Sequence, residues 1–173
     1  MICALIAAGV SSACAAGVVF TGVNLAGAEF GDNTLPGAYN AHYTYPTAAE
    51  VDYFITRKGM NTVRLPFRWE RLQRSLNGPF DAAELGRLQS FVSYANGKGA
   101  SVILDPHNYG KYFNNVIGSS QVPIAAFSDF WTRLANLYRT NSRDIFGLMN
   151  EPNGMSTEAW RDAANAAIAA ISR

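Results

Sequence analysis

A repeated strand-then-helix unit is the feature of this sequence that most restricts its fold. Four short runs of apolar and β-branched residues begin at positions 18, 61, 100 and 145, and a segment with helical periodicity follows each run. The runs cover residues 18–25, 61–66, 100–106 and 145–149. Strands that alternate with helices in this way form a parallel sheet, so we predict an α/β fold.

Helix start signals support this division of the chain. Thr47 and Glu50 have the spacing of a capping box, and Asp81 can cap the second helical segment. The third and fourth segments carry Trp131 and Trp160 on apolar faces, where we expect both rings to lie in the core.

Polar residues lie at or just after the carboxyl end of each predicted strand. They are Asn24, Arg64, Asp105, His107, Asn150 and Glu151. In a (β/α)8 TIM barrel the active site is built from these strand ends and from the loops that follow them. We therefore predict parallel (β/α) units of a TIM barrel, with about four of the eight units present.

Composition excludes several classes of function. With 14 Lys and Arg against 13 Asp and Glu, the net charge is +1 and there is no basic run for nucleic acid. No glycine-rich nucleotide-binding motif follows a strand. Two histidines, with the cysteines confined to positions 3 and 14, do not give the usual zinc-site spacing. We expect no cofactor, no metal and no nucleic-acid partner.

Residues 1–16 contain no charged side chain. An apolar stretch is followed by small residues that end in Ala13-Cys14-Ala15, which resembles the cleavage site of a secretory leader. The alternatives are a membrane anchor and a frayed amino-terminal tail, and a leader would normally have Lys or Arg after Met1. We expect residues 1–16 to be removed on export, which leaves a secreted mature protein without a membrane segment.

The strand ends carry residue types suited to acid catalysis on sugars. A glutamate such as Glu151, partly desolvated by aromatic loops, can act as a proton donor, unless it is only a surface-loop residue. The amide of Asn150 can hold a substrate hydroxyl. The guanidinium of Arg64 can orient a carboxylate, or it can simply neutralise Asp105 or Glu151. His107 can bind a sugar hydroxyl or can only support its neighbours.

Taken together, the four strand ends resemble those of glycoside hydrolase family 5, in the variants found in secreted endo-β-1,4-glucanases. The matching segments are Gly22-Val-Asn24-Leu-Ala-Gly27, Arg64-Leu-Pro66, Asp105-Pro-His107-Asn108-Tyr109 and Gly147-Leu-Met-Asn150-Glu151-Pro152. The resemblance implies a retaining glycosidase that cleaves β-glucan. In it Glu151 is the general acid/base, Asn150 holds the hydroxyl beside the scissile bond and Arg64 orients the nucleophile. The implied substrate-binding residues are His107, Asn108, Tyr109 and Asn24.

Aromatic residues are frequent in the loops after the first and third strands. They are Phe30, Tyr39, Tyr43, Tyr45, Tyr109, Tyr112 and Phe113. Flat rings stack on pyranose faces, so these side chains could form sugar subsites, although each could instead serve in packing. Glu29 and Glu70, in contrast, are expected to be solvated or to cap helices.

A retaining glycosidase needs a second carboxyl group about 5 to 5.5 Å from the first. In the family that this chain resembles, the nucleophile follows the seventh strand. The spacing of the units places that nucleophile at roughly position 280. We therefore expect residues 17–173 to be the amino-terminal half of a catalytic domain, inactive alone, from a monomeric full-length enzyme. The alternatives are a non-catalytic half-barrel that binds β-glucan or self-associates, and an enzyme for mannan or another β-glycan.

Overall fold

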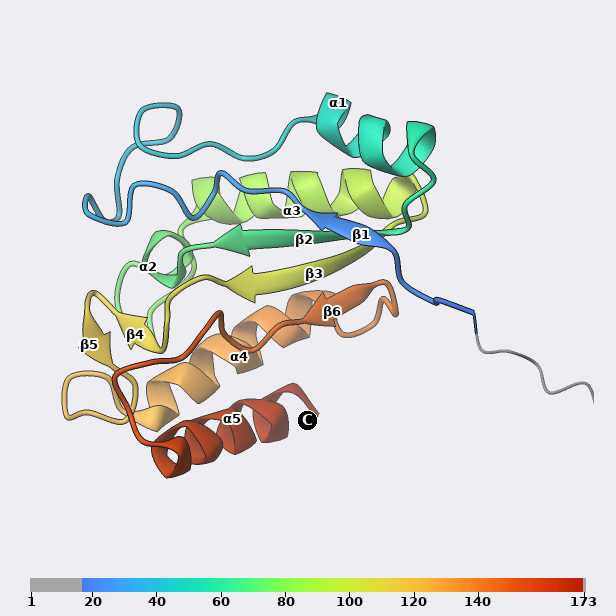
Figure 1. Ribbon diagram of the computed structural model, residues 1–173. Helices are drawn as coiled ribbons and strands as arrows, with labels where there is room; N and C mark the ends of the chain where they lie inside the picture. The colour runs from blue at the N-terminus through green and yellow to red at the C-terminus, as the bar shows by residue number, and fades with distance from the viewer. Residues whose placement is uncertain (1–16, 173) are drawn as a thin grey trace, which may run out of the picture.

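The computed structural model describes residues 17–172 and contains a four-stranded parallel sheet (Figure 1). Its strands are β1 (Gly22–Asn24), β2 (Thr62–Phe67), β3 (Ser101–Pro106) and β6 (Asp144–Phe146), which lie side by side in chain order. Each neighbouring pair is parallel, so all four carboxyl ends lie at one edge of the sheet. This confirms the predicted α/β fold of parallel units.

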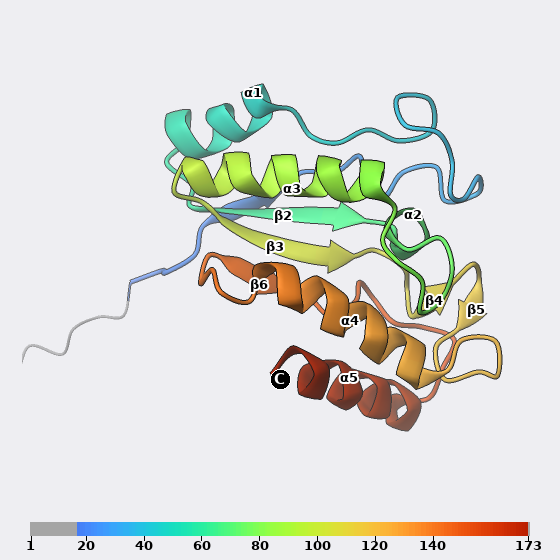
Figure 2. The same cartoon turned by 180° about the vertical axis from the view of Figure 1, so that it is seen from behind.

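Helices connect the strands. They are α1 (Ala48–Val51) with its π-helical continuation η1 (Asp52–Arg57), α2 (Trp69–Leu72), α3 (Ala82–Gly97), α4 (Ile124–Tyr138) and α5 (Thr157–Ile171). The helices α3 and α4 lie behind the sheet in Figure 1 and in front of it in Figure 2. Within residues 17–172 these helices therefore cover one face of the sheet and leave the other face open.

Alternate residues along the central strands separate the two faces. Val63 and Leu65 in β2, with Val102 and Leu104 in β3, are fully buried in the hydrophobic core. The residues between them belong to the opposite face, and Arg64 is one of these. The four buried residues therefore face the helix-covered side of the sheet, and polar side chains such as Arg64 lie on the open side.

The helix start signals act as predicted. Glu50 N–H donates to Thr47 Oγ1 over 3.3 Å, and Thr47 N–H donates to Glu50 Oε2 over 2.7 Å. Asp81 accepts from the N–H of Glu84 in the first turn of α3. Trp131 is fully buried as expected, whereas Trp160 is only half-buried against Phe127.

Two strands are shorter than the sequence indicates. The run at 18–25 contributes only Gly22–Asn24, and of the run at 145–149 only Ile145 and Phe146 belong to β6, which begins at Asp144. Within the described residues each of these edge strands pairs with one neighbour at three positions, although β2 and β3 themselves continue further. The short hairpin β4 (Lys111–Tyr112) and β5 (Asn115–Val116) and the single turn of α2 were not predicted.

A buried arginine organises the long first loop. Arg71 is fully buried, and it donates to the carbonyl oxygens of Ala28 and Pro36 over 2.5 and 2.9 Å. Its guanidinium carbon lies 3.8 Å from the centre of the Tyr43 ring. Burial lowers the pKa of Arg71. These contacts hold the loop between β1 and α1 against α2.

The hydroxyl group of Tyr43 gives the fold a testable pH dependence. Burial and the hydrogen bond to Glu84 raise its pKa to about 12, against about 10 in an unfolded chain. The raised pKa stabilises the folded state below pH 10, and this contribution is lost as the pH rises through 10 to 12. We expect Tyr43→Phe to reduce the loss of unfolding free energy across this window by about 2 kcal/mol or less. Urea unfolding of the intact protein at a series of pH values between 10 and 12 measures this free energy.

The matched control is Tyr53→Phe, which changes an exposed tyrosine. The control should leave the slope between pH 10 and 12 unchanged. Equal slopes in both variants and the wild type would contradict the assignment to Tyr43.

The predicted leader, residues 1–16, lies outside the described residues. Among the helices of residues 17–172, none is long and apolar enough to cross a membrane.

Candidate active site

Arg64 is the centre of a polar cluster at the carboxyl edge of the sheet. Its Nη1 donates to Asn24 Oδ1 over 2.6 Å, and its Nη2 donates to Asn150 Oδ1 over 2.7 Å. The same Nη2 lies 2.7 Å from Asp105 Oδ2 in an ion pair whose carboxylate is 5% exposed. The structure thus brings together residues from all four units that the sequence analysis assigned to the site.

The register of the sheet explains why these side chains meet. Asn24 in β1 is the direct partner of Arg64 in β2, and Arg64 is the partner of Ile103 in β3. Asp105 lies two residues beyond Ile103 and therefore on the same face. The N–H of Asn150 donates to the carbonyl of Pro106 over 3.0 Å, which fixes the chain after β6 beside β3.

His107 and Tyr109 extend the cluster along the loop after β3. Asp105 Oδ2 lies 3.0 Å from His107 Nδ1, and His107 Nε2 lies 3.2 Å from the Tyr109 hydroxyl. Tyr109 adopts a left-handed backbone conformation with φ of 56°, and its carbonyl accepts from the N–H of Asn153. The loops after β3 and β6 are therefore joined directly.

Glu151 follows Asn150 at this edge with its side chain exposed to solvent. Its backbone φ is +36°, a left-handed conformation that non-glycine residues adopt infrequently. Within residues 17–172 no hydrogen bond or ion pair involves its carboxylate. The partial desolvation expected from the sequence is absent in this part of the chain, because no described loop covers the side chain.

Asn108 is placed differently from the other predicted substrate-binding residues. It is 3% exposed; its Oδ1 accepts from the N–H of Trp69, and its Nδ2 donates to Glu70 Oε2 over 2.6 Å. Glu70 also accepts from the N–H of Phe113 and is 1% exposed. The side chain of Asn108 therefore holds α2 rather than pointing to the open face.

The expectation that Glu29 and Glu70 are solvated or cap helices is wrong, because both are buried and accept from loop residues. Glu29 is 8% exposed, and its Oε2 accepts from the N–H of Gly27 over 2.7 Å. Glu70 bridges two loops, as described above. Both carboxylates are buried because they satisfy donors that the turns next to the strands leave unpaired.

Several loop aromatics serve in packing. Tyr43 and Tyr45 are buried, and their hydroxyls donate to Glu84 over 2.7 and 3.1 Å. Tyr112 is buried and donates to the carbonyl of Gln73. Only a few of these rings remain accessible for contact with a sugar, chiefly Phe30, which is 56% exposed, together with Tyr39 and Phe113.

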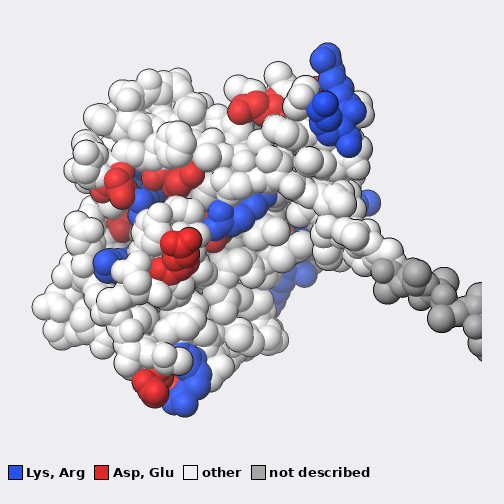
Figure 3. Space-filling model, in the orientation of Figure 1, with Lys and Arg blue, Asp and Glu red and all other residues white. Residues whose placement is uncertain are grey.

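Charged side chains gather on the open face over the carboxyl ends of the strands (Figure 3). A cavity of about 240 Å³ lies at this edge between Asp32, Arg68, Tyr109 and Lys111. Within residues 17–172 no group of three or more His, Cys, Asp or Glu could hold a metal ion.

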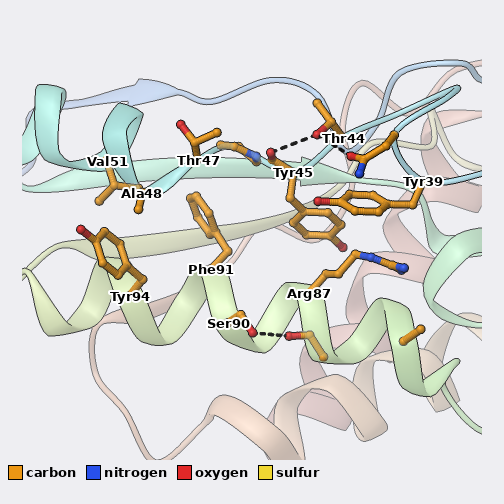
Figure 4. A pocket seen from close by; sticks show the side chains of 14 residues that line it. Tyr39, Thr44, Tyr45, Thr47, Ala48, Val51, Arg87, Ser90, Phe91 and Tyr94 are labelled. Carbon is orange, nitrogen blue, oxygen red and sulfur yellow. Dashed lines mark hydrogen bonds between the residues drawn. The ribbon is translucent and has the colours of Figure 1, made fainter.

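A larger cavity of about 760 Å³ lies between α3 and the loop before α1 (Figure 4). Tyr39, Tyr45, Phe91 and Tyr94 line it. No carboxylate and none of the residues around Arg64 belong to its lining. It therefore lacks the carboxylate that hydrolysis by an acidic side chain requires, and the carboxyl edge of the sheet remains the candidate active site.

Comparison with known proteins points to one family. The sequence model described as cellulase (glycosyl hydrolase family 5) matches residues 20–173. Endoglucanase 3 of Humicola insolens is 37% identical over 151 residues, which are 87% of this chain and 38% of that protein. A probable endo-β-1,4-glucanase B of Aspergillus oryzae is 40% identical over 151 residues, which are 87% of this chain and 44% of that protein.

Solved structures agree with this match. An endo-β-1,4-glucanase of Xanthomonas axonopodis pv. citri is 46% identical with a TM-score of 0.86, covering 88% of this chain and 48% of that one. The endoglucanase Cel5A of Pseudomonas stutzeri, solved with cellobiose, is 36% identical with a TM-score of 0.83, covering 90% and 47%. The present chain spans less than half the length of each of these relatives.

Proposed function

Because the chain belongs to glycosyl hydrolase family 5, the cellulases, we propose that the intact protein is a retaining endo-β-1,4-glucanase. The observation that supports this proposal is the cluster around Arg64, whose guanidinium contacts both Asn150 and Asp105 at the carboxyl edge of the sheet, with the exposed Glu151 next to Asn150 in the chain. The names of the relatives as endoglucanases support the choice of β-1,4-glucan.

In this proposal Glu151 is the general acid/base and Asn150 holds the hydroxyl next to the scissile bond. The carbonyl oxygen of the Asn150 amide accepts from Arg64, so its NH2 group is left to donate to a sugar hydroxyl. Arg64 in turn holds the amide in one orientation. Proton transfer by Glu151 then occurs at a bond whose neighbouring hydroxyl is already fixed.

Arg64 would also orient the nucleophile. Its interactions with Asn24, Asn150 and Asp105 use the two terminal nitrogens, and a guanidinium offers five N–H donors in all. Asp105 is buried in its ion pair and is poorly placed to attack a sugar. We propose that the second carboxylate comes from the part of the relatives' length that residues 1–173 do not span.

His107, Tyr109 and Asn24 are proposed to bind substrate, since their polar groups lie next to Arg64 and Asp105. The side chain of Asn108 would contribute indirectly, by holding α2 in place, and not by contact with substrate. Residues 17–173 would form the amino-terminal half of a monomeric catalytic domain. An uncharged, apolar segment at 1–16 supports secretion.

The test compares substrates with the intact protein. We expect reducing ends and falling viscosity from soluble β-1,4-glucan, with slower release from β-1,4-mannan, whose 2-hydroxyl has the opposite configuration. Faster release from mannan would move the assignment to a mannanase. Binding of glucan without release of reducing ends would support the non-catalytic β-glucan-binding alternative.

A further inference from the structure

We propose that Asp105 is a positioning residue that holds His107 in the tautomer with the proton on Nδ1, so that Nε2 is an acceptor on the open face of the sheet. This inference deepens the proposed glucanase function and rests on it for its role in substrate binding. The proposed catalytic steps use the carboxylate of Asp105 neither as acid/base nor as nucleophile.

The first step concerns the hydrogen-bonding capacity of Asp105. Its Oδ2 lies 2.7 Å from Arg64 Nη2 and 3.0 Å from His107 Nδ1, and its side chain is 5% exposed. A carboxylate that is ion-paired with a guanidinium can only accept hydrogen bonds. His107 Nδ1 must therefore be the donor, and in the neutral ring Nε2 carries no proton.

The second step concerns the groups that meet Nε2. The Tyr109 hydroxyl lies 3.2 Å away, and with Nε2 unprotonated this hydroxyl is the donor. His107 is 16% exposed, so its ring remains partly open to the side where substrate would lie. Asp105 thus determines, through the ring, which of the neighbouring hydroxyl groups donate and which accept.

The third step separates this role from the neutralisation of Arg64. Arg64 is also held by Asn24 and Asn150, so its position does not depend on Asp105 alone. His107 Nδ1 has Asp105 as its hydrogen-bond partner within the described residues. Loss of the acceptor should therefore affect the tautomer of His107 more than the placement of Arg64.

The experiment uses two substitutions in the intact protein. Asp105→Asn removes the charge and keeps an oxygen that can accept from His107 Nδ1, whereas Asp105→Ala removes both. Long-range proton–nitrogen NMR spectra at about pH 8, where an ordinary histidine is neutral, report the tautomer. The His107 signals are assigned by their loss in His107→Gln.

We expect the Nδ1-protonated ring in the wild type and in Asp105→Asn, and a ring protonated on Nε2 in Asp105→Ala. The KM for soluble β-1,4-glucan should rise about tenfold in Asp105→Ala and stay within about threefold in Asp105→Asn, with smaller changes in kcat. Asp144→Ala, which removes a partly buried carboxylate at the other end of the sheet, should change neither the tautomer nor KM.

A wild-type ring protonated on Nε2 would overturn the inference, and this measurement needs no variant to fold. Equal rises in KM in both Asp105 variants, without a change of tautomer, would also overturn it, because they would trace the effect to the charge on Arg64. A protein with the expected tautomers that hydrolyses no glycan would instead contradict the proposed function.

Discussion

Replacing Glu151 by Gln in the intact protein is expected to lower the hydrolysis of natural β-1,4-glucan by roughly 10²- to 10⁴-fold, the usual contribution of general acid–base catalysis. Glutamine keeps the size of the side chain and removes the transferable proton. An aryl glycoside whose leaving group needs no proton should lose much less in its glycosylation step. Rates on the two substrates, measured on the same preparation, give the comparison.

The position of Glu151 makes this a clean substitution. The side chain is exposed, and within residues 17–172 its carboxylate makes no hydrogen bond that the change would break. Glutamine and glutamate have side chains of the same shape, so the left-handed backbone at this position gives no reason for the substitution to disturb the fold. Glu158→Gln, at an exposed glutamate of α5, is the matched control and should retain wild-type rates. Equal losses on both substrates would argue against an acid role.

The arrangement around Arg64 follows from rules that act along the sequence. Parallel strands bring their carboxyl ends to one edge, and the two-residue alternation of a strand places Arg64 on the same face as Asn24 and Asp105. The helix caps at Thr47 and Asp81 depend on residues only three positions apart. Such features could be predicted without knowledge of distant contacts.

Roles that depend on distant partners could not be predicted in this way. Tyr43 and Tyr45 lie in a loop whose aromatic residues suggest sugar binding. Their hydroxyls instead donate to Glu84, which lies about 40 residues further along the chain. Asn108 lies within a motif that is similar to those of the family, yet its amide is taken up by Trp69 and Glu70 of the preceding unit.

The open side of the sheet leads to the second large effect. We expect a polypeptide of residues 17–173, expressed by itself, to associate into dimers or larger species and to show no glucanase activity. In this polypeptide β1 and β6 each have one unpaired edge, and exposed strand edges template pairing with other chains. Val18, Val19 and Phe20, which precede β1, are 82%, 71% and 57% exposed.

The energetic argument concerns apolar surface. Apolar residues of the helix-free face, such as Ile103 and Ile145, are only partly buried in residues 17–172. At about 25 cal/mol per Å² of apolar surface left in water, several such side chains cost an amount comparable with a domain stability of roughly 5 to 15 kcal/mol. Association that covers this face and pairs the edges is therefore favoured. We expect catalysis to fail for a separate reason: the proposed mechanism needs a second carboxylate to form a glycosyl intermediate, and Asp105, the carboxylate in the cluster around Arg64, is buried in an ion pair.

Analytical ultracentrifugation should show species of at least twice the monomer mass, and binding of an apolar dye should exceed that of the intact protein. Val19→Lys places a charge next to the edge of β1 and should reduce association without restoring activity. A monodisperse monomer that unfolds in one sharp transition would contradict the prediction and would indicate that four units suffice for a stable fold. Turnover of soluble glucan that disappears in Glu151→Gln would show that a carboxylate within residues 17–173 acts as the nucleophile.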